Sequence, residues 1–229
     1  ITFGQYDTKI MNRILSLGFS PFLILATDSL ILILLNTILQ KYGGKSQGDM
    51  FITCATIAQS YLLLITSPMI GISGGTQAIL SYNYGARRAD RVKDAERNIL
   101  GVMLIFTTIM FLLSRLVPRY FVLLFTSDPQ YISFSVWAIH TYTLMIIPLS
   151  FQYVFVDGLT ALDRPKTGLA LSVTRKSLFV LSAAILPVFF GAKAAFFAEP
   201  VTDGVCSVLS TVVFLLLINR HLQKRCQTV

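Results

Sequence analysis

Charged residues are scarce in this 229-residue chain. Asp, Glu, Lys and Arg make up only 13% of the sequence, whereas 54% of the residues are apolar. Soluble domains carry about 25% charged residues, and the mean hydropathy of this chain is clearly positive. The composition therefore argues against an ordinary soluble fold and favours a membrane protein.

Cysteine and histidine are scarce too. Cys54, Cys206, Cys226, His140 and His221 lie apart, and their spacing matches no metal or redox motif. We interpret the cysteines as packing residues and expect neither a metal site nor a bound cofactor. An enzyme embedded in the membrane would need paired His, a nucleophile beside a base or a metal cluster. Because the sequence contains no such pattern, we do not expect an enzyme.

Long apolar runs are what the chain does have. A membrane-spanning helix needs about 20 apolar residues. Runs of this length predict spans over residues 14–39, 51–79, 97–117, 132–157, 168–190 and 196–219. The segment 118–130 is bracketed by Pro118 and Pro129 and is expected to lie at the membrane interface. The sequence thus predicts an all-α membrane protein in which residues 1–229 form one bundle of six transmembrane helices.

The formal charge of +8 would also suit a nucleic-acid partner, but the basic residues lie at the ends of the apolar runs. Nucleic acid is therefore not expected as a partner. In the six-span arrangement, 14 of the 19 Lys and Arg residues fall on one side of the membrane. Because positive residues accumulate on the cytoplasmic side, we expect a multi-pass protein of the plasma (inner) membrane with both chain ends in the cytoplasm.

The second predicted span is unusually rich in residues that weaken a helix. These residues are Pro68, Gly71, Gly74 and Gly75. Two interpretations are open: the small residues allow close helix packing, or they make a flexible helix that lines a solute path. Gln77 and Asn83 add polar groups toward the end of the same span, where we expect a structural role.

The run from Gly71 to Ala86, followed by Arg91-Val-Lys, resembles a motif of the multidrug and toxic compound extrusion (MATE) family. Its motif residues are Gly74, Gly75, Gln77, Asn83 and Gly85. Two later stretches extend the resemblance over nearly the whole chain. Leu159–Lys166 is similar to a short cytoplasmic turn of the family, with Thr160 and Asp163 in place of Gln and Gly. The sequence from Leu171 to Asp203 resembles the last two helices.

This resemblance implies one lobe of a twelve-helix transporter, because the family has two six-helix bundles related by pseudo-symmetry. The lobe would be the C-terminal one, and the polar residues 1–9 would be a stretch exposed by truncation. The implied partners are membrane lipid, a missing N-terminal six-helix bundle and a cationic or amphipathic small-molecule substrate. The implied function is secondary active multidrug efflux by antiport, with a proton or sodium ion as the coupling ion and no other cofactor.

A charged residue inside a span costs about 2.5–3.5 kcal/mol on insertion scales, so each such residue invites a functional or structural reason, and four of them need weighing here. They are Asp28, Arg175, Glu199 and Asp203. Glu199 and Asp203 are four residues apart and share a helix face, so their carboxylates repel unless they bind a proton or a cation. Arg175 could reach Asp203 or extend back to the lipid headgroups. The acids could exchange ions or bind a cationic substrate, or they could form a static network with Arg175.

The fourth predicted span carries aromatic and polar residues that could line a cavity for planar cations. These are Trp137, His140, Tyr142, Gln152, Tyr153 and Asp157. The alternative is that they anchor the helix at the interface and pack against neighbours, which fits Trp137 best. Gln152 and Asp157 remain candidates for a cavity.

Two other functions remain open. A lipid-linked oligosaccharide flippase would share the bundle plan, although it would favour a cavity rich in basic residues, and mid-span Lys and Arg are few. A nonenzymatic subunit of a membrane assembly would differ from both carriers because it would show no solute-dependent proton or sodium flux in proteoliposomes.

Overall fold

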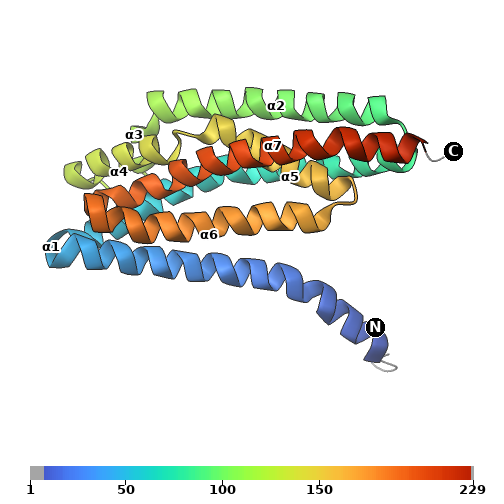
Figure 1. Ribbon diagram of the computed structural model, residues 1–229. Helices are drawn as coiled ribbons and strands as arrows, with labels where there is room; N and C mark the ends of the chain where they lie inside the picture. The colour runs from blue at the N-terminus through green and yellow to red at the C-terminus, as the bar shows by residue number, and fades with distance from the viewer. Residues whose placement is uncertain (1–7, 228–229) are drawn as a thin grey trace, which may run out of the picture.

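The structure is a computed structural model that describes residues 8–227, except the side chains of residues 9–10, 12–26, 28, 45–46 and 219–227. Every regular element in this part is helical, which confirms the predicted all-α class. The elements are α1 (Thr8–Gly85), α2 (Ala89–Leu116), α3 (Pro118–Val122), α4 (Pro129–Tyr142), α5 (Ile146–Ala161), α6 (Pro165–Phe190), η1 (Ala192–Phe197) and α7 (Ala198–Gln227). Figure 1 shows the long helices running beside one another.

The long helix α1 folds back on itself at Gly44. The backbone angles of Gly44, φ 65° and ψ −173°, lie in a region that is essentially restricted to glycine. A Cβ on Gly43 would lie 2.8 Å from the Cα of Gly48, so the backbone segments on either side of the turn are in contact. We call residues 8–43 the first arm and residues 45–85 the second arm. Figure 1 shows the first arm, in blue, along one side of the bundle.

The fourth predicted span, over residues 132–157, is not one continuous helix in the structure. The chain forms α4 and α5 instead, which are bent by 47° relative to each other at the break between residues 142 and 146. Pro148 has no N–H to donate to the carbonyl of Leu144, so the helix loses a hydrogen bond at this point. The hydroxyl of Thr143 lies 3.0 Å from that of Ser114 on α2, which gives the break a polar partner.

Four helices in the described part are long and apolar enough to cross a membrane. They cover Gln47–Gly85, Ala89–Leu116, Pro165–Phe190 and Ala192–Ile218, and the bent pair α4–α5 makes a fifth if it counts as one span. The predicted span 14–39 falls on the first arm, where most side chains lie outside the described residues. The assignment of residues 1–229 to one six-span bundle therefore stays a prediction.

The two ends of the bundle differ in composition. Aromatic rings gather at one end, where Phe196 packs against Phe134 at 5.3 Å and Trp137 at 5.5 Å between ring centroids. We call this the aromatic end. The turns 86–88 and 162–164 lie at the opposite end, which we call the charged end because it holds Arg87, Arg88, Arg164 and the exposed basic residues at the start of α2. The central helix α5 packs against α1, α2, α6 and α7.

Candidate functional site

An ion-pair cluster links α6 to α7 between the two ends of the bundle. Nε of Arg175 donates to Oδ1 of Asp203 at 2.9 Å, and Nη2 donates to the same oxygen at 2.6 Å. Nη2 also donates to Oε1 of Glu199 at 2.9 Å. The four-residue spacing on α7 places both carboxylates on one helix face, toward α6. Of the two predicted positions for Arg175, the structure adopts the one that reaches Asp203.

The cluster contains more acceptors than Arg175 satisfies. Asp203 is fully buried, and its second oxygen, Oδ2, has no hydrogen-bond partner among the described residues. The side chains of Arg175 and Glu199 are 23% and 15% exposed, so the cluster opens on one side only. With all three groups ionised, two carboxylates face one guanidinium and a formal negative charge remains. Such an arrangement can take up a proton or a cation.

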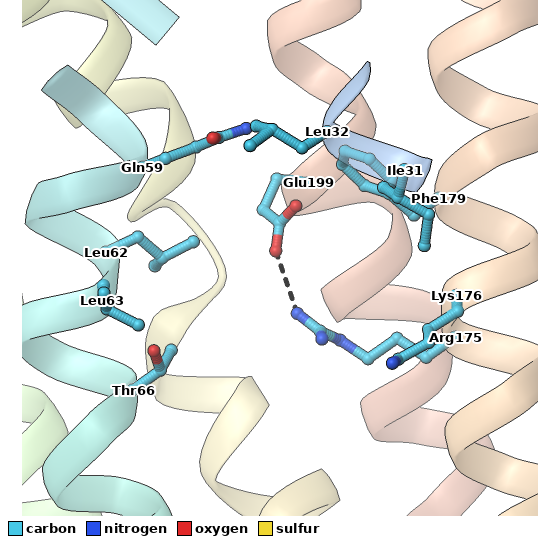
Figure 2. A pocket seen from close by; sticks show the side chains of 10 residues that line it. All are labelled: Ile31, Leu32, Gln59, Leu62, Leu63, Thr66, Arg175, Lys176, Phe179 and Glu199. Carbon is cyan, nitrogen blue, oxygen red and sulfur yellow. Dashed lines mark hydrogen bonds and ion pairs between the residues drawn. The ribbon is translucent and has the colours of Figure 1, made fainter. Parts of the chain in front are cut away.

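A cavity of about 360 Å³ adjoins the cluster. Its polar lining residues are Gln59, Thr66, Arg175, Lys176 and Glu199. The remaining lining is apolar and includes Leu62, Leu63 and Phe179, so the cavity lies between both arms of α1, α6 and the start of α7. In Figure 2 the Glu199 carboxylate and the Arg175 guanidinium point toward each other in this space, opposite Leu62 and Thr66. Small-molecule sites commonly combine such apolar walls with a few polar groups.

Of the other residues predicted for ion coupling or substrate binding, the two whose side chains the structure describes, Gln152 and Asp157, do not line this cavity. Asp28 lies on the first arm, but its side chain is outside the described residues, so its role stays a prediction. Gln152 is 4% exposed on α5, and its Oε1 has no hydrogen-bond partner in the described structure. Asp157, also on α5, is half-buried and is not among the residues that line the cavity.

The glycines of that motif do not pack tightly within this lobe. A Cβ added to Gly71, Gly74, Gly75 or Gly85 would meet no atom within 4 Å. The described contacts within this lobe therefore show no close packing at these glycines. Nδ2 of Asn83 donates to the carbonyl of Ile79 at 2.9 Å, and the structural role of this residue stays a prediction. The second arm also continues as a helix through Pro68 and the glycines.

Sequence reasoning missed one buried acid, Glu96 on α2. Glu96 is only 5% exposed, and neither of its carboxylate oxygens has a hydrogen-bond partner in the described part of the chain. The dense run of charges from residue 87 to residue 97 concealed it. Its spacing from Val92 and Ile99 was the available signal, since both are buried on the same face of α2.

The family comparison agrees with this architecture. A model of the MatE family matches residues 24–186, which is well over half of the chain. The chain belongs to the MatE family. It is therefore a multi-pass membrane protein of a transporter family, surrounded by lipid, and its family consists of transporters and not of enzymes.

Solved MATE structures have the same fold. One shows the inward-facing conformation of a multidrug resistance MATE family transporter of the MOP superfamily; it is 17% identical, with a TM-score of 0.85 over 98% of this chain and 51% of that one. Another shows MATE in the bent conformation, at 16% identity and a TM-score of 0.81, over 98% of this chain and 49% of that one. The MatE chain described here thus spans about half the length of these transporters, as expected for a MATE-type lobe.

A curated relative extends the comparison to sequence. The FAD transporter of Shewanella oneidensis is 26% identical over 149 residues, which cover 65% of this chain and 32% of the relative. The match therefore concerns a third of that protein.

Proposed function

We propose that this chain is one lobe of a secondary active exporter, which moves a cationic or amphipathic small molecule out of the cell in exchange for a proton or a sodium ion. The observation that carries the proposal is the buried cluster of Arg175, Glu199 and Asp203 at the edge of a cavity. A buried ion pair is not required for stability, since well-packed apolar residues would serve as well or better. An acid pair kept beside a cavity therefore favours a functional role.

Competition for the two carboxylates supplies a coupling step. In the described state, Asp203 and Glu199 both accept hydrogen bonds from Arg175. A proton or sodium ion that binds at Oδ2 of Asp203 would neutralise the charge that holds the guanidinium. Arg175 would then be held to α7 through Glu199 alone, and the contact between α6 and α7 would loosen. The two carboxylates could thus alternate between binding the Arg175 guanidinium and binding a proton or sodium ion.

The cavity lining suits an amphipathic cation. Leu62, Leu63 and Phe179 offer apolar surface, and Glu199 offers a carboxylate at the cavity wall. Transport by alternating access needs a second bundle against which this one moves, and we propose a six-helix bundle N-terminal to this chain for that role. The natural setting would be the plasma membrane, with the charged end of this lobe in the cytoplasm.

A second candidate function has an observation of its own. The cavity wall contains two basic residues, Arg175 and Lys176, beside one acid, and the curated relative is named as an FAD transporter. An anionic dinucleotide is therefore the alternative substrate class. It predicts that replacing Lys176 with Gln reduces transport of FAD, whereas a cationic substrate would be transported as well as before or better.

The test is Asp203→Asn in the full-length protein, measured as efflux of a fluorescent cationic dye from cells. We expect gradient-dependent efflux to be lost, because an amide cannot exchange a proton or hold a sodium ion as a carboxylate does. Asp94→Asn is the matched control, since Asp94 is an exposed acid on α2. Undiminished efflux by the Asp203 variant, at a normal amount of protein in the membrane, would contradict the proposal.

A further inference from the structure

Glu96 occupies an unusual place at the charged end of the bundle. It lies on α2 where this helix packs against α1 and α5, and its side chain points at Gly158 of α5. A Cβ on Gly158 would lie 2.5 Å from Oε1 and 3.1 Å from Oε2 of Glu96. The glycine is thus what allows the carboxyl group to lie against the backbone of α5.

The surroundings of this carboxyl group do not suit an ion. Both of its oxygens are buried and lack a hydrogen-bond donor in the described structure. A carboxylate in such a place would lose the hydrogen bonds of water and gain none in return. The neutral acid has a lower desolvation penalty, because it carries no net charge.

The charged groups around Glu96 point the same way. On α5 the neighbour is Asp157, whose charge repels a carboxylate at Glu96. On α2 itself, Lys93 lies about one turn away and is exposed. Arg87 and Arg164 lie in the turns at the same end, and neither donates a hydrogen bond to Glu96. The described acids of the second arm of α1 and of α7 lie toward the aromatic end, far along their helices.

We infer that Glu96 is a proton-binding site at the α2–α5 interface, and that the close contact with Gly158 persists only while the proton is bound. Loss of the proton gives a carboxylate and a hydronium ion in the water at the charged end. The carboxylate then needs hydration, so α2 and α5 must separate there. A metal ion is a poorer occupant, because no group of three or more potential metal ligands among His, Cys, Asp and Glu exists in the described part of the chain.

This site is separate from the cluster at Arg175 and does not depend on the proposed export. It lies at the other side of α5 from α6, on a helix that contributes nothing to the cavity. Proton binding at Glu96 can therefore be measured whether or not the protein exports a cation. Loss of efflux in the Asp203 variant and loss of the proton at Glu96 are distinguishable results.

Infrared difference spectroscopy of the purified full-length protein in lipid, recorded against pH, tests the inference. The wild-type protein should show the band of a buried protonated carboxyl group that disappears as the pH rises. Glu96→Gln should lose this band, whereas Asp94→Asn, which removes an exposed acid two residues earlier, should keep it. An unchanged band in the Glu96 variant would overturn the inference.

A second variant keeps Glu96 in place and changes only its neighbour. In Asp157→Asn the repulsion between the two acids is removed, so the band should persist but disappear at a lower pH than in the wild type. The band at an unchanged pH would show that the titrating group does not sense Asp157, which contradicts the assigned site. This variant also serves if Glu96→Gln fails to fold.

Discussion

A double-mutant cycle on Arg175 and Asp203 separates a static ion pair from a working one. Removing one partner of a buried ion pair costs about 3–5 kcal/mol. In Asp203→Asn the guanidinium keeps its hydrogen bond to Glu199 at 2.9 Å. Because such a charge-assisted bond contributes about 1.5–3 kcal/mol to stability, we expect this variant to lose only about 1–3 kcal/mol of unfolding free energy. Arg175→Gln leaves two carboxylates on one face of α7 without a cation, so we expect the free energy of unfolding to fall by about 3–5 kcal/mol.

The double variant should be less destabilised than the sum of the single changes, by about 0.5–3 kcal/mol, as groups in contact usually are. Thermal unfolding of the four purified proteins in lipid measures these differences. Additivity within about 0.5 kcal/mol would refute the described contact between Arg175 and Asp203.

The same four proteins then decide between the two roles of the cluster. A static network needs only its charge balance. The double variant keeps the one net negative charge of the ionised cluster, so it would recover both stability and transport. A cluster that exchanges a cation needs the Asp203 carboxylate itself. On this account the double variant regains stability and still transports nothing. Transport by the double variant at the wild-type rate would refute the coupling role.

Two further predictions concern the fold. Gly44→Ala and Gly191→Ala should each destabilise the protein by about 1–3 kcal/mol, because both glycines have positive φ with extended ψ. Gly101→Ala is the control: the added Cβ would meet no atom within 4 Å, so the change should be nearly neutral, and melting temperatures check this. Phe196→Ala should destabilise the protein by about 3–5 kcal/mol, since its ring is fully buried in the aromatic end. Phe190→Ala should destabilise it far less, because that residue is 76% exposed. Equal shifts of the melting temperature in the two variants would contradict this prediction.

Only part of the ion-pair cluster followed from the sequence. The four-residue spacing of Glu199 and Asp203 fixed their common helix face, and the expense of charges in a membrane indicated a partner. The side chain of Arg175 could reach either Asp203 or the lipid headgroups. Its contact with Asp203 could be established only from the relative positions of α6 and α7. Neither position is a local property of the chain.

Other features depended on backbone detail that residue patterns do not reveal. Length and hydropathy placed the fourth predicted span over residues 132–157, but they do not show that the helix breaks before Pro148. The burial of Glu96 came from its contact with Gly158, 62 residues later, which no local pattern predicts. The motif glycines, conversely, suggested close packing from their type alone, although the structure leaves Gly74 and Gly75 open on this lobe.

The most direct test of the central claim is ion movement in proteoliposomes that contain the full-length protein. A gradient of a cationic dye would be imposed, and the proton and sodium concentrations inside would be followed. The account predicts that dye moving one way drives a proton or sodium flux the other way, and that Asp203→Asn abolishes this flux. Dye transport without an opposing flux of either ion would contradict the account.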